Sequence, residues 1–173
     1  MDLLIRPARN DDLPRLRDIE TAAGEAFRQI GMAAVADDAP PSLDALATYQ
    51  RDGRAWVATN SCGEPIAYIL VEIADGHAHI SQVSVHPDHA RQGVGGALIE
   101  EAARWAVERK LQGVTLTTFR DVPWNAPYYS RLGFVQLPEQ QCMEDIRQIL
   151  EAEKAHGLHA WPRVVMKKAA TDS

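Results

Sequence analysis

The chain has 173 residues, of which 46% are hydrophobic and 24% are charged, as in an ordinary globular protein. This length suits a single domain with a sizeable core, and we expect one domain over residues 1–173 with a polar tail from about residue 169. The 18 Lys and Arg residues against 24 Asp and Glu residues give a net charge of −6. Nucleic acid and anionic membrane are therefore not expected as main partners, because both require a basic surface.

Targeting segments and metal-binding patterns are also not indicated. The first residues lack the basic start and apolar stretch of a signal peptide, and no apolar run approaches the roughly 18 residues of a membrane span. We therefore expect a cytoplasmic protein. Cys62 and Cys142 have no C-x-x-C partner, and the pair His77 and His79 has no third ligand nearby, so no disulfide framework and no metal site are predicted.

The first third of the chain predicts a strand followed by two helices. The strand covers residues 3–6, and a helix capped by Asn10 runs to Ile30 with an interruption around Gly24. After a loop, Ser42 is placed to cap a second, short helix.

The middle of the chain predicts an antiparallel meander. Its strands cover residues 55–58, 66–73 and 79–85, and Asp75-Gly76 forms the second hairpin turn. A helix over residues 95–110 follows, because apolar side chains recur there at spacings of three and four.

The last third predicts alternating strands and helices: a strand over 114–119, a helix over 125–132, a strand from 134, a helix over 143–154 and a strand over 163–166. The complete order predicts an α/β fold of the α+β type, with a mixed, mostly antiparallel central sheet and helices on both faces.

Three glycines, Gly93, Gly95 and Gly96, lie between a strand and a helix. Glycines let the backbone turn sharply and approach an anion, and the start of a helix presents unpaired N–H donors. A dinucleotide fingerprint is excluded because Leu98 occupies the place of its last glycine, and a Walker loop is excluded because no Lys follows. The loop is either a pyrophosphate cradle or a tight turn without a ligand.

Residues 90–95 fill the frame Gln/Arg-x-x-Gly-x-Gly/Ala, with Ala90 in the first place. This stretch resembles the acetyl-CoA-binding motif of the GCN5-related N-acetyltransferase (GNAT) superfamily. The resemblance covers nearly the whole chain, since residues 5–8 and 11–13 look like the first strand and helix of that family, and residues 129–134 look like its Tyr-x-x-x-Gly-Phe signature.

The resemblance implies acetyl-CoA as cosubstrate, bound in a cleft where two parallel strands splay apart. The pantetheine would pair with the strand before the glycine loop, and the pyrophosphate would accept hydrogen bonds from the loop. The implied cofactor-binding residues are Val83, Ser84, Val85, Arg91, Gln92, Gly93, Val94, Gly95 and Gly96. Asn125 either reaches the cofactor as well or caps its helix, and we favour the cap.

Acetyl transfer to an amine requires an acid and a base. An amine with a pKa of about 10.4 is mostly protonated at neutral pH, and the departing thiolate needs a proton. Tyr129 occupies the position of the family's tyrosine and is the predicted acid; packing beneath the sheet is the alternative for its ring. Tyr128 is adjacent and is expected to face the other side of the helix.

His79 is the predicted general base, because it falls where the histone-acetylating branch of the family has a glutamate. The alternative for His79 is a half-exposed histidine on the rim of a strand. Glu20, Glu25 and Glu72 are the carboxylate alternatives for the base.

The sequence thus predicts an acetyl-CoA-dependent N-acetyltransferase that acts by direct transfer to a primary amine in a ternary complex. We expect a small-molecule acceptor, and four aspartates near the acceptor side indicate a cationic one: Asp37, Asp38, Asp44 and Asp52. The alternatives are a non-catalytic acyl-CoA-binding module of the same fold, transfer of a longer acyl group, and a protein or peptide amine as acceptor. The resemblance also allows a homodimer, since dimerisation is common in the family.

Overall fold

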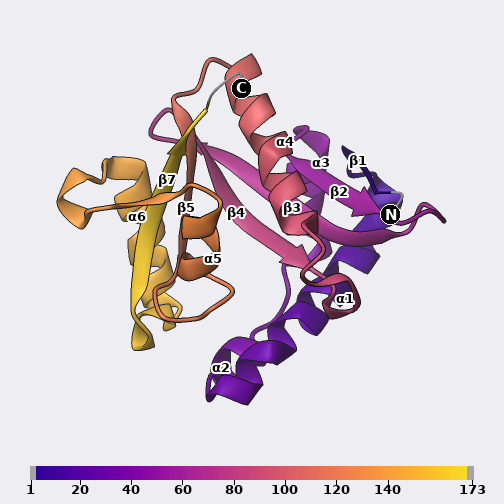
Figure 1. The fold of residues 1–173 in the computed structure, drawn as a ribbon, viewed down its shortest axis with the longest axis horizontal. Coiled ribbons are helices and arrows are strands. Elements are labelled where there is room, and N and C mark those ends of the chain that lie inside the picture. The colour runs from indigo at the N-terminus through magenta and orange to yellow at the C-terminus, as the bar shows by residue number, and fades with distance from the viewer. Residues whose placement is uncertain (1–2, 171–173) are drawn as a thin grey trace. The chain divides into compact units, whose positions relative to one another are not determined.

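The structure is a computed structural model, and it describes residues 3–170 (Figure 1). The chain divides into two compact units, the first made of Met1–Val71 and Ser81–Glu101 and the second of Glu72–Ile80 and Ala102–Ser173. The end of the predicted polar tail, residues 171–173, lies outside the described residues.

Within residues 3–170, seven strands are hydrogen-bonded in the order β1-β2-β3-β4-β5-β7-β6. Pairs β1·β2, β2·β3, β5·β7 and β6·β7 are antiparallel, and β4·β5 is parallel. The prediction of a mixed, mostly antiparallel sheet is therefore confirmed. The strands are β1 (Leu4–Pro7), β2 (Ala55–Thr59), β3 (Pro65–Ala74), β4 (His77–Val85), β5 (Gly113–Phe119), β6 (Val135–Leu137) and β7 (Arg163–Ala169).

Six α-helices accompany the strands in the described part of the chain: α1 (Leu13–Gly24), α2 (Ala33–Ala36), α3 (Leu43–Arg51), α4 (Val94–Glu108), α5 (Ala126–Arg131) and α6 (Glu144–Ala155). The predicted interruption around Gly24 is confirmed, because the helix continues from there as a 3-10 helix over Glu25–Ile30. The prediction of Asn10 as a cap is wrong. Asn10 lies inside a short 3-10 helix, and the carboxylate of Asp12 instead accepts a hydrogen bond of 2.7 Å from the backbone N–H of Arg9.

In the first unit, helices α1 and α3 pack together and cover the apolar side chains of β2 and β3. The periodic residues of the two helices fill this core, which explains why their spacing predicted them. The cluster consists of Ala8, Leu13, Leu16, Ile19, Leu46, Ala55, Val57, Tyr68 and Leu70.

In the second unit, α6 lies alongside β7 and packs its apolar face on it (Figure 1). Ile146 of α6 and Val165 of β7 are both buried, together with Ala74 at the end of β3 and the thiol-bearing Cys142. Burial raises the pKa of the Cys142 thiol, so the neutral, unreactive form is favoured.

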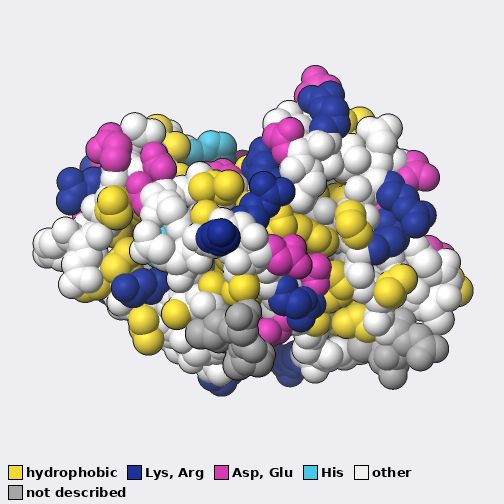
Figure 2. All heavy atoms as spheres, turned by 90° about the horizontal axis from the view of Figure 1, so that it is seen from above, with side chains coloured by type: hydrophobic (Ala, Val, Ile, Leu, Met, Phe, Trp, Pro, Cys, Tyr) yellow, Lys and Arg dark blue, Asp and Glu magenta, His cyan; other side chains and the backbone are white. Residues whose placement is uncertain are grey.

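On the face that Figure 2 shows, Lys and Arg side chains are interspersed with Asp and Glu side chains, and neither sign forms an extended patch. The net charge of −6 is thus not concentrated on this face. Among the described residues, no helix has both the length and the apolar character needed to cross a membrane.

Candidate functional site

The glycine loop of the first unit joins β4 to α4. The strand ends at Val85, a 3-10 turn covers Pro87–His89, and α4 begins at Val94. Two residues between the turn and the helix have left-handed backbone conformations, Arg91 with φ 63° and Gly93 with φ 79°. A non-glycine residue with positive φ is uncommon, so the loop holds the backbone of Arg91 in a conformation of higher energy.

This loop exposes backbone N–H groups. Arg91, Gln92 and Gly93 are exposed, and a Cβ built on Gly93 would meet no atom within 4 Å. The first backbone bond of α4 runs from the N–H of Ala97 to the carbonyl of Gly93 at 3.1 Å, so the N–H groups of residues 94–96 have no partner within the helix. Open space and unpaired donors at a helix start fit a pyrophosphate.

Ser84, in the strand before this loop, is buried, and its side chain belongs to a hydrogen-bonded group that the sequence did not predict. The carboxylate of Glu20, in α1, accepts hydrogen bonds from the hydroxyls of Ser84 and Tyr68, the latter at 3.0 Å, and from the amide of Gln82. The amide of Gln82 also donates to the Ser84 hydroxyl at 2.9 Å. We call Glu20, Tyr68, Gln82 and Ser84 the Glu20 cluster.

Burial raises the pKa of Glu20 above its ordinary value, although the hydrogen bonds from Ser84 and Tyr68 act in the opposite direction. Asp38 raises the pKa further because it carries a like charge. The structure therefore moves the proton affinity of Glu20 toward neutral pH.

His79 lies in the second unit and is only 3% exposed, so the alternative of a half-exposed rim histidine is wrong. The cause is its pairing opposite Thr115 of β5, whose hydroxyl lies 2.9 Å from Nδ1 of the ring. Burial lowers the pKa of His79, against the opposing influence of Glu72 and two other carboxylates. Its role as a base stays a prediction.

Tyr129 is buried in α5, and Tyr128 next to it is half-buried. The ring of Tyr129 makes edge contacts with Phe134 and Tyr128, at centroid separations of 5.9 Å and 5.5 Å. Burial, with a smaller contribution from Tyr128, raises the pKa of Tyr129 well above its ordinary value. The phenol therefore keeps its proton at neutral pH, as a general acid must.

Asn125 stands at the N-cap of α5, but its side chain makes no capping hydrogen bond, so the favoured prediction of a cap is wrong. Its amide nitrogen donates instead to the carbonyl of Trp124 at 3.2 Å. Its Oδ1 atom is buried without a hydrogen-bond partner in the described part of the chain. A buried acceptor without a hydrogen bond destabilises the fold unless a ligand or water donates to it. The alternative that Asn125 reaches the cofactor therefore stays open.

The residue pattern of the acetyltransferase (GNAT) family matches residues 13–134, which include α1, the Glu20 cluster, the glycine loop and Tyr129. The chain belongs to the acetyltransferase (GNAT) family. Acyl transfer is the activity that this membership supports.

Many solved structures share the GNAT fold with this chain, and three of them illustrate the range of acceptors. The ribosomal-protein-S18-alanine N-acetyltransferase from Escherichia coli is 21% identical, with 99% of this chain and 96% of that chain covered and a TM-score of 0.64. The PaiA N-acetyltransferase from Thermoplasma acidophilum, solved with coenzyme A, is 15% identical, with 98% and 99% covered and a TM-score of 0.71.

The third is N-acetylglutamate synthase from Neisseria gonorrhoeae, complexed with coenzyme A and N-acetyl-glutamate. It is 13% identical, with 99% of this chain and 36% of that chain covered and a TM-score of 0.71. The first structure is named for a protein substrate and the third holds a small molecule, and at these identities the likeness shows the fold alone. The structural neighbours therefore do not decide the acceptor of this GNAT protein.

The alternative base Glu25 and the four aspartates predicted near the acceptor are exposed, and some of them are paired. Glu25 and Asp37 both bind the guanidinium of Arg28, and Asp52 binds that of Arg54. Exposed ion pairs of this kind contribute little energy, and these carboxylates already have cationic partners. They are weaker candidates for a site that takes a cation than Glu20.

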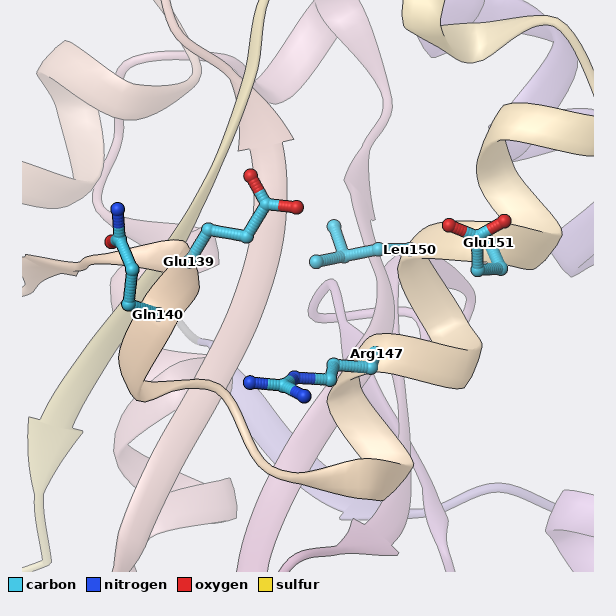
Figure 3. Close-up of a pocket in the computed structure, with 5 residues that line it drawn as sticks. All are labelled: Glu139, Gln140, Arg147, Leu150 and Glu151. Carbon is cyan, nitrogen blue, oxygen red and sulfur yellow. The ribbon is translucent and has the colours of Figure 1, made fainter.

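A pocket of about 510 Å³ in the second unit lies between α6 and a 3-10 helix, and the side chains of Glu139 and Arg147 point into it (Figure 3). It contains none of the residues that the sequence singled out. Among residues 3–170, no three His, Cys, Asp or Glu side chains are grouped so that they could hold a metal ion.

The sequence missed Tyr68 and Gln82, the partners of Glu20. Tyr68 lies within an apolar run of β3, and nothing local marks its hydroxyl as a donor. Gln82 and Ser84 are two residues apart on β4 and so share a face, where they form a polar row after Ala78 and Ile80. That polar row was the available signal.

Proposed function

We propose that this GNAT protein transfers the acetyl group of acetyl-CoA to a primary amine of a small molecule, by direct attack while both substrates are bound. The observation that carries the proposal is the glycine loop of the first unit, in which Arg91 and Gly93 have left-handed conformations and open space lies beside Gly93, just before the start of α4. Membership of the family supports the acyl transfer itself.

The residues present fit acetyl-CoA as a substrate. The N–H groups from Arg91 to Gly96 supply donors for a pyrophosphate, and the open space at Gly93 allows close approach. In the second unit, the unpartnered Oδ1 of Asn125 can accept a hydrogen bond from a hydroxyl or N–H donor of a substrate. The cleft between splayed strands stays a prediction. The strand expected to pair with the pantetheine, which carries Ser84, lies in the first unit, and the predicted acid Tyr129 lies in the second.

The reaction needs three proton transfers. The ammonium of the acceptor gives one proton to a general base, and its nitrogen then forms the N–C bond as the C–S bond breaks. The thiolate that leaves takes a proton from Tyr129, and the nitrogen loses its second proton, which restores the phenol through solvent. Tyr129 can give this proton because it is protonated at neutral pH, although its raised pKa makes it a weaker acid than an ordinary phenol.

The experiment is a thiol-release screen of the purified protein with acetyl-CoA and a panel of amines and peptides. Replacing Tyr129 by Phe should lower kcat by about 100-fold or more, the usual contribution of a general acid, and leave acetyl-CoA affinity unchanged. The neighbouring substitution Tyr128→Phe is the matched control and should keep kcat.

Other results would favour the alternatives. Acetyl-CoA binding without thiol release from any amine would indicate a non-catalytic module. Tighter competition by longer acyl-CoAs would indicate a longer acyl group, and release with peptides alone would indicate a protein acceptor.

A further inference from the structure

We propose that Glu20 binds the cationic amine of the acceptor and takes its proton. This inference rests on the proposed function and names the base that the reaction requires. It is drawn from the Glu20 cluster, in which one carboxylate is held by three neutral donors and has no cationic partner among residues 3–170.

The two oxygens of the Glu20 carboxylate are used unequally. Oε2 accepts hydrogen bonds from Tyr68 at 3.0 Å, from Gln82 at 3.0 Å and from the Ser84 hydroxyl. Oε1 accepts only from Gln82, at 3.2 Å. The first oxygen fixes the orientation of the carboxylate, and the second keeps a lone pair for a further donor.

Within the described part of the chain, no positive charge balances the negative charge of Glu20. No Lys, Arg or His of the described residues forms an ion pair with it, and the groups that face it are the neutral Tyr68 of β3, Gln82 and Ser84 of β4, and the like-charged Asp38 after α2. A partly buried carboxylate is costly without a counter-charge. A primary ammonium supplies both the missing charge and the missing N–H donor.

Glu20 is reachable, although its neighbours are not. Leu16 and Ile19 on the same helix have no exposed surface, whereas Glu20 is half-buried at the flank of α1. Its link to Ser84 joins the carboxylate to the strand that is expected to pair with the pantetheine. An amine on Oε1 would therefore lie beside the strand that carries the thioester substrate.

Glu20 takes one proton from the ammonium of the acceptor. One N–H bond of the ammonium breaks and one O–H bond forms on Oε1, which leaves a neutral amine with a lone pair and a neutral carboxylic acid. The raised pKa of Glu20 reduces the free-energy cost of this proton transfer, because it brings the pKa of the carboxyl closer to that of the amine. The proton then leaves to solvent, and the carboxylate is restored.

His79 fits the same task less well. It is almost fully buried, and Nδ1 is engaged by the Thr115 hydroxyl. Burial lowers its pKa, so it holds a proton less readily than an ordinary histidine. These contacts suit a histidine that positions strands β4 and β5.

The experiment compares the purified wild-type protein with Glu20→Gln and with Asp18→Asn, an exposed carboxylate on the same helix. The acceptor probes are spermidine, glucosamine and lysine amide, with thiol release as the readout. For the probe that wild type acetylates, Glu20→Gln should lower kcat/KM at least 100-fold and keep the KM for acetyl-CoA. Asp18→Asn should match wild type.

The pH profile separates a base from a structural contact. The wild-type kcat/KM should fall in acid as Glu20 becomes protonated, and the Glu20→Gln profile should lack this limb. Tyr68→Phe keeps the base but removes a bond that favours the charged form, so its acid limb should move to higher pH. This second variant tests the inference even where Glu20→Gln fails to fold.

Two results would overturn the inference. A folded Glu20→Gln variant with wild-type kcat/KM and an unchanged pH profile would show that Glu20 only holds α1 on the sheet, while the transferase activity stands. Acetyl-CoA binding without acetylation of any amine by wild type would overturn the proposed function, and the inference with it.

Discussion

Asp75 and Asp145 each accept a hydrogen bond from the backbone N–H of the other. The N–H of Asp75 donates to Oδ2 of Asp145 at 2.8 Å, and the N–H of Asp145 donates to Oδ1 of Asp75 at 2.9 Å. Oδ2 of Asp75 also accepts from the N–H of Ile146 at 2.9 Å. The hairpin turn between β3 and β4 thus caps a helix whose first turn lies 70 residues later in the chain.

Replacing Asp75 by Ala should destabilise the protein by about 2 kcal/mol, of which about 1 is the lost cap and about 1 is the left-handed backbone that Ala tolerates poorly. The φ of Asp75 is 51°. Asp75→Asn tolerates this conformation and keeps one acceptor, so it should cost less. Urea unfolding measures the stability of both variants. Equal losses of stability in Asp75→Ala and Asp75→Asn would contradict the role of Asp75 as a cap of α6.

Replacing Gly93 by Val should weaken acetyl-CoA binding more than it weakens the fold. Its left-handed φ of 79° disfavours a β-branched residue, and the Cβ would enter the open space where the pyrophosphate is expected. Gly63→Val is the matched control, since Gly63 has φ 81° and open space in a hairpin of the same unit. Calorimetric titration should show at least a 10-fold higher Kd for Gly93→Val and an unchanged Kd for Gly63→Val; equal Kd values would contradict the cradle.

Two helix caps should respond differently to alanine. The hydroxyl of Ser42 accepts a hydrogen bond of 3.1 Å from the N–H of Ala45, so Ser42→Ala should cost about 1 kcal/mol of stability. Asn125 makes no such bond and buries an unpartnered oxygen, so Asn125→Ala should leave the melting temperature unchanged or raise it. If Asn125 contacts acetyl-CoA, Asn125→Ala should bind acetyl-CoA more weakly. A clear loss of stability without loss of acetyl-CoA binding would instead indicate that Asn125 caps α5.

The ion pair between Asp12 and Arg6 should make the stability of the protein fall in acid. Burial by itself would raise the pKa of Asp12, but hydrogen bonds from Arg6, at 2.8 Å and 3.1 Å, and from the N–H of Arg9 outweigh it and lower the pKa. A carboxyl with a depressed pKa contributes stability above its unfolded pKa of about 3.9 and loses that contribution as the pH falls through its lower folded value.

Asp12→Asn should therefore be less stable than wild type by about 2 kcal/mol at pH 7, and the difference should shrink below about pH 4. Urea unfolding at pH 7 and at pH 3 measures this. A difference that stays constant with pH would show that the charge of Asp12 is not the cause.

The sequence determined the elements whose signals are local. Helical spacing in α1, α3, α4 and α6, the hairpin turn at Asp75-Gly76 and the cap at Ser42 all depend on residues a few positions apart, so one sequence suffices to find them. Helix α2 was missed because four residues hold no repeat. The glycine loop and the position of Tyr129 were likewise readable from short motifs.

Only the tertiary structure decided which polar groups meet. Tyr68 and Ser84 reach Glu20 across 48 and 64 residues, and no periodicity encodes such a pairing. The burial of His79 against Thr115 and the missing cap at Asn125 also depend on neighbours brought together by folding. The sequence by itself therefore determined the family and the glycine loop before α4, because short motifs, turns and helix starts are local. The environment of each titratable group depends on burial and long-range contacts, and for that reason only the folded chain distinguished Glu20 from the other candidate bases.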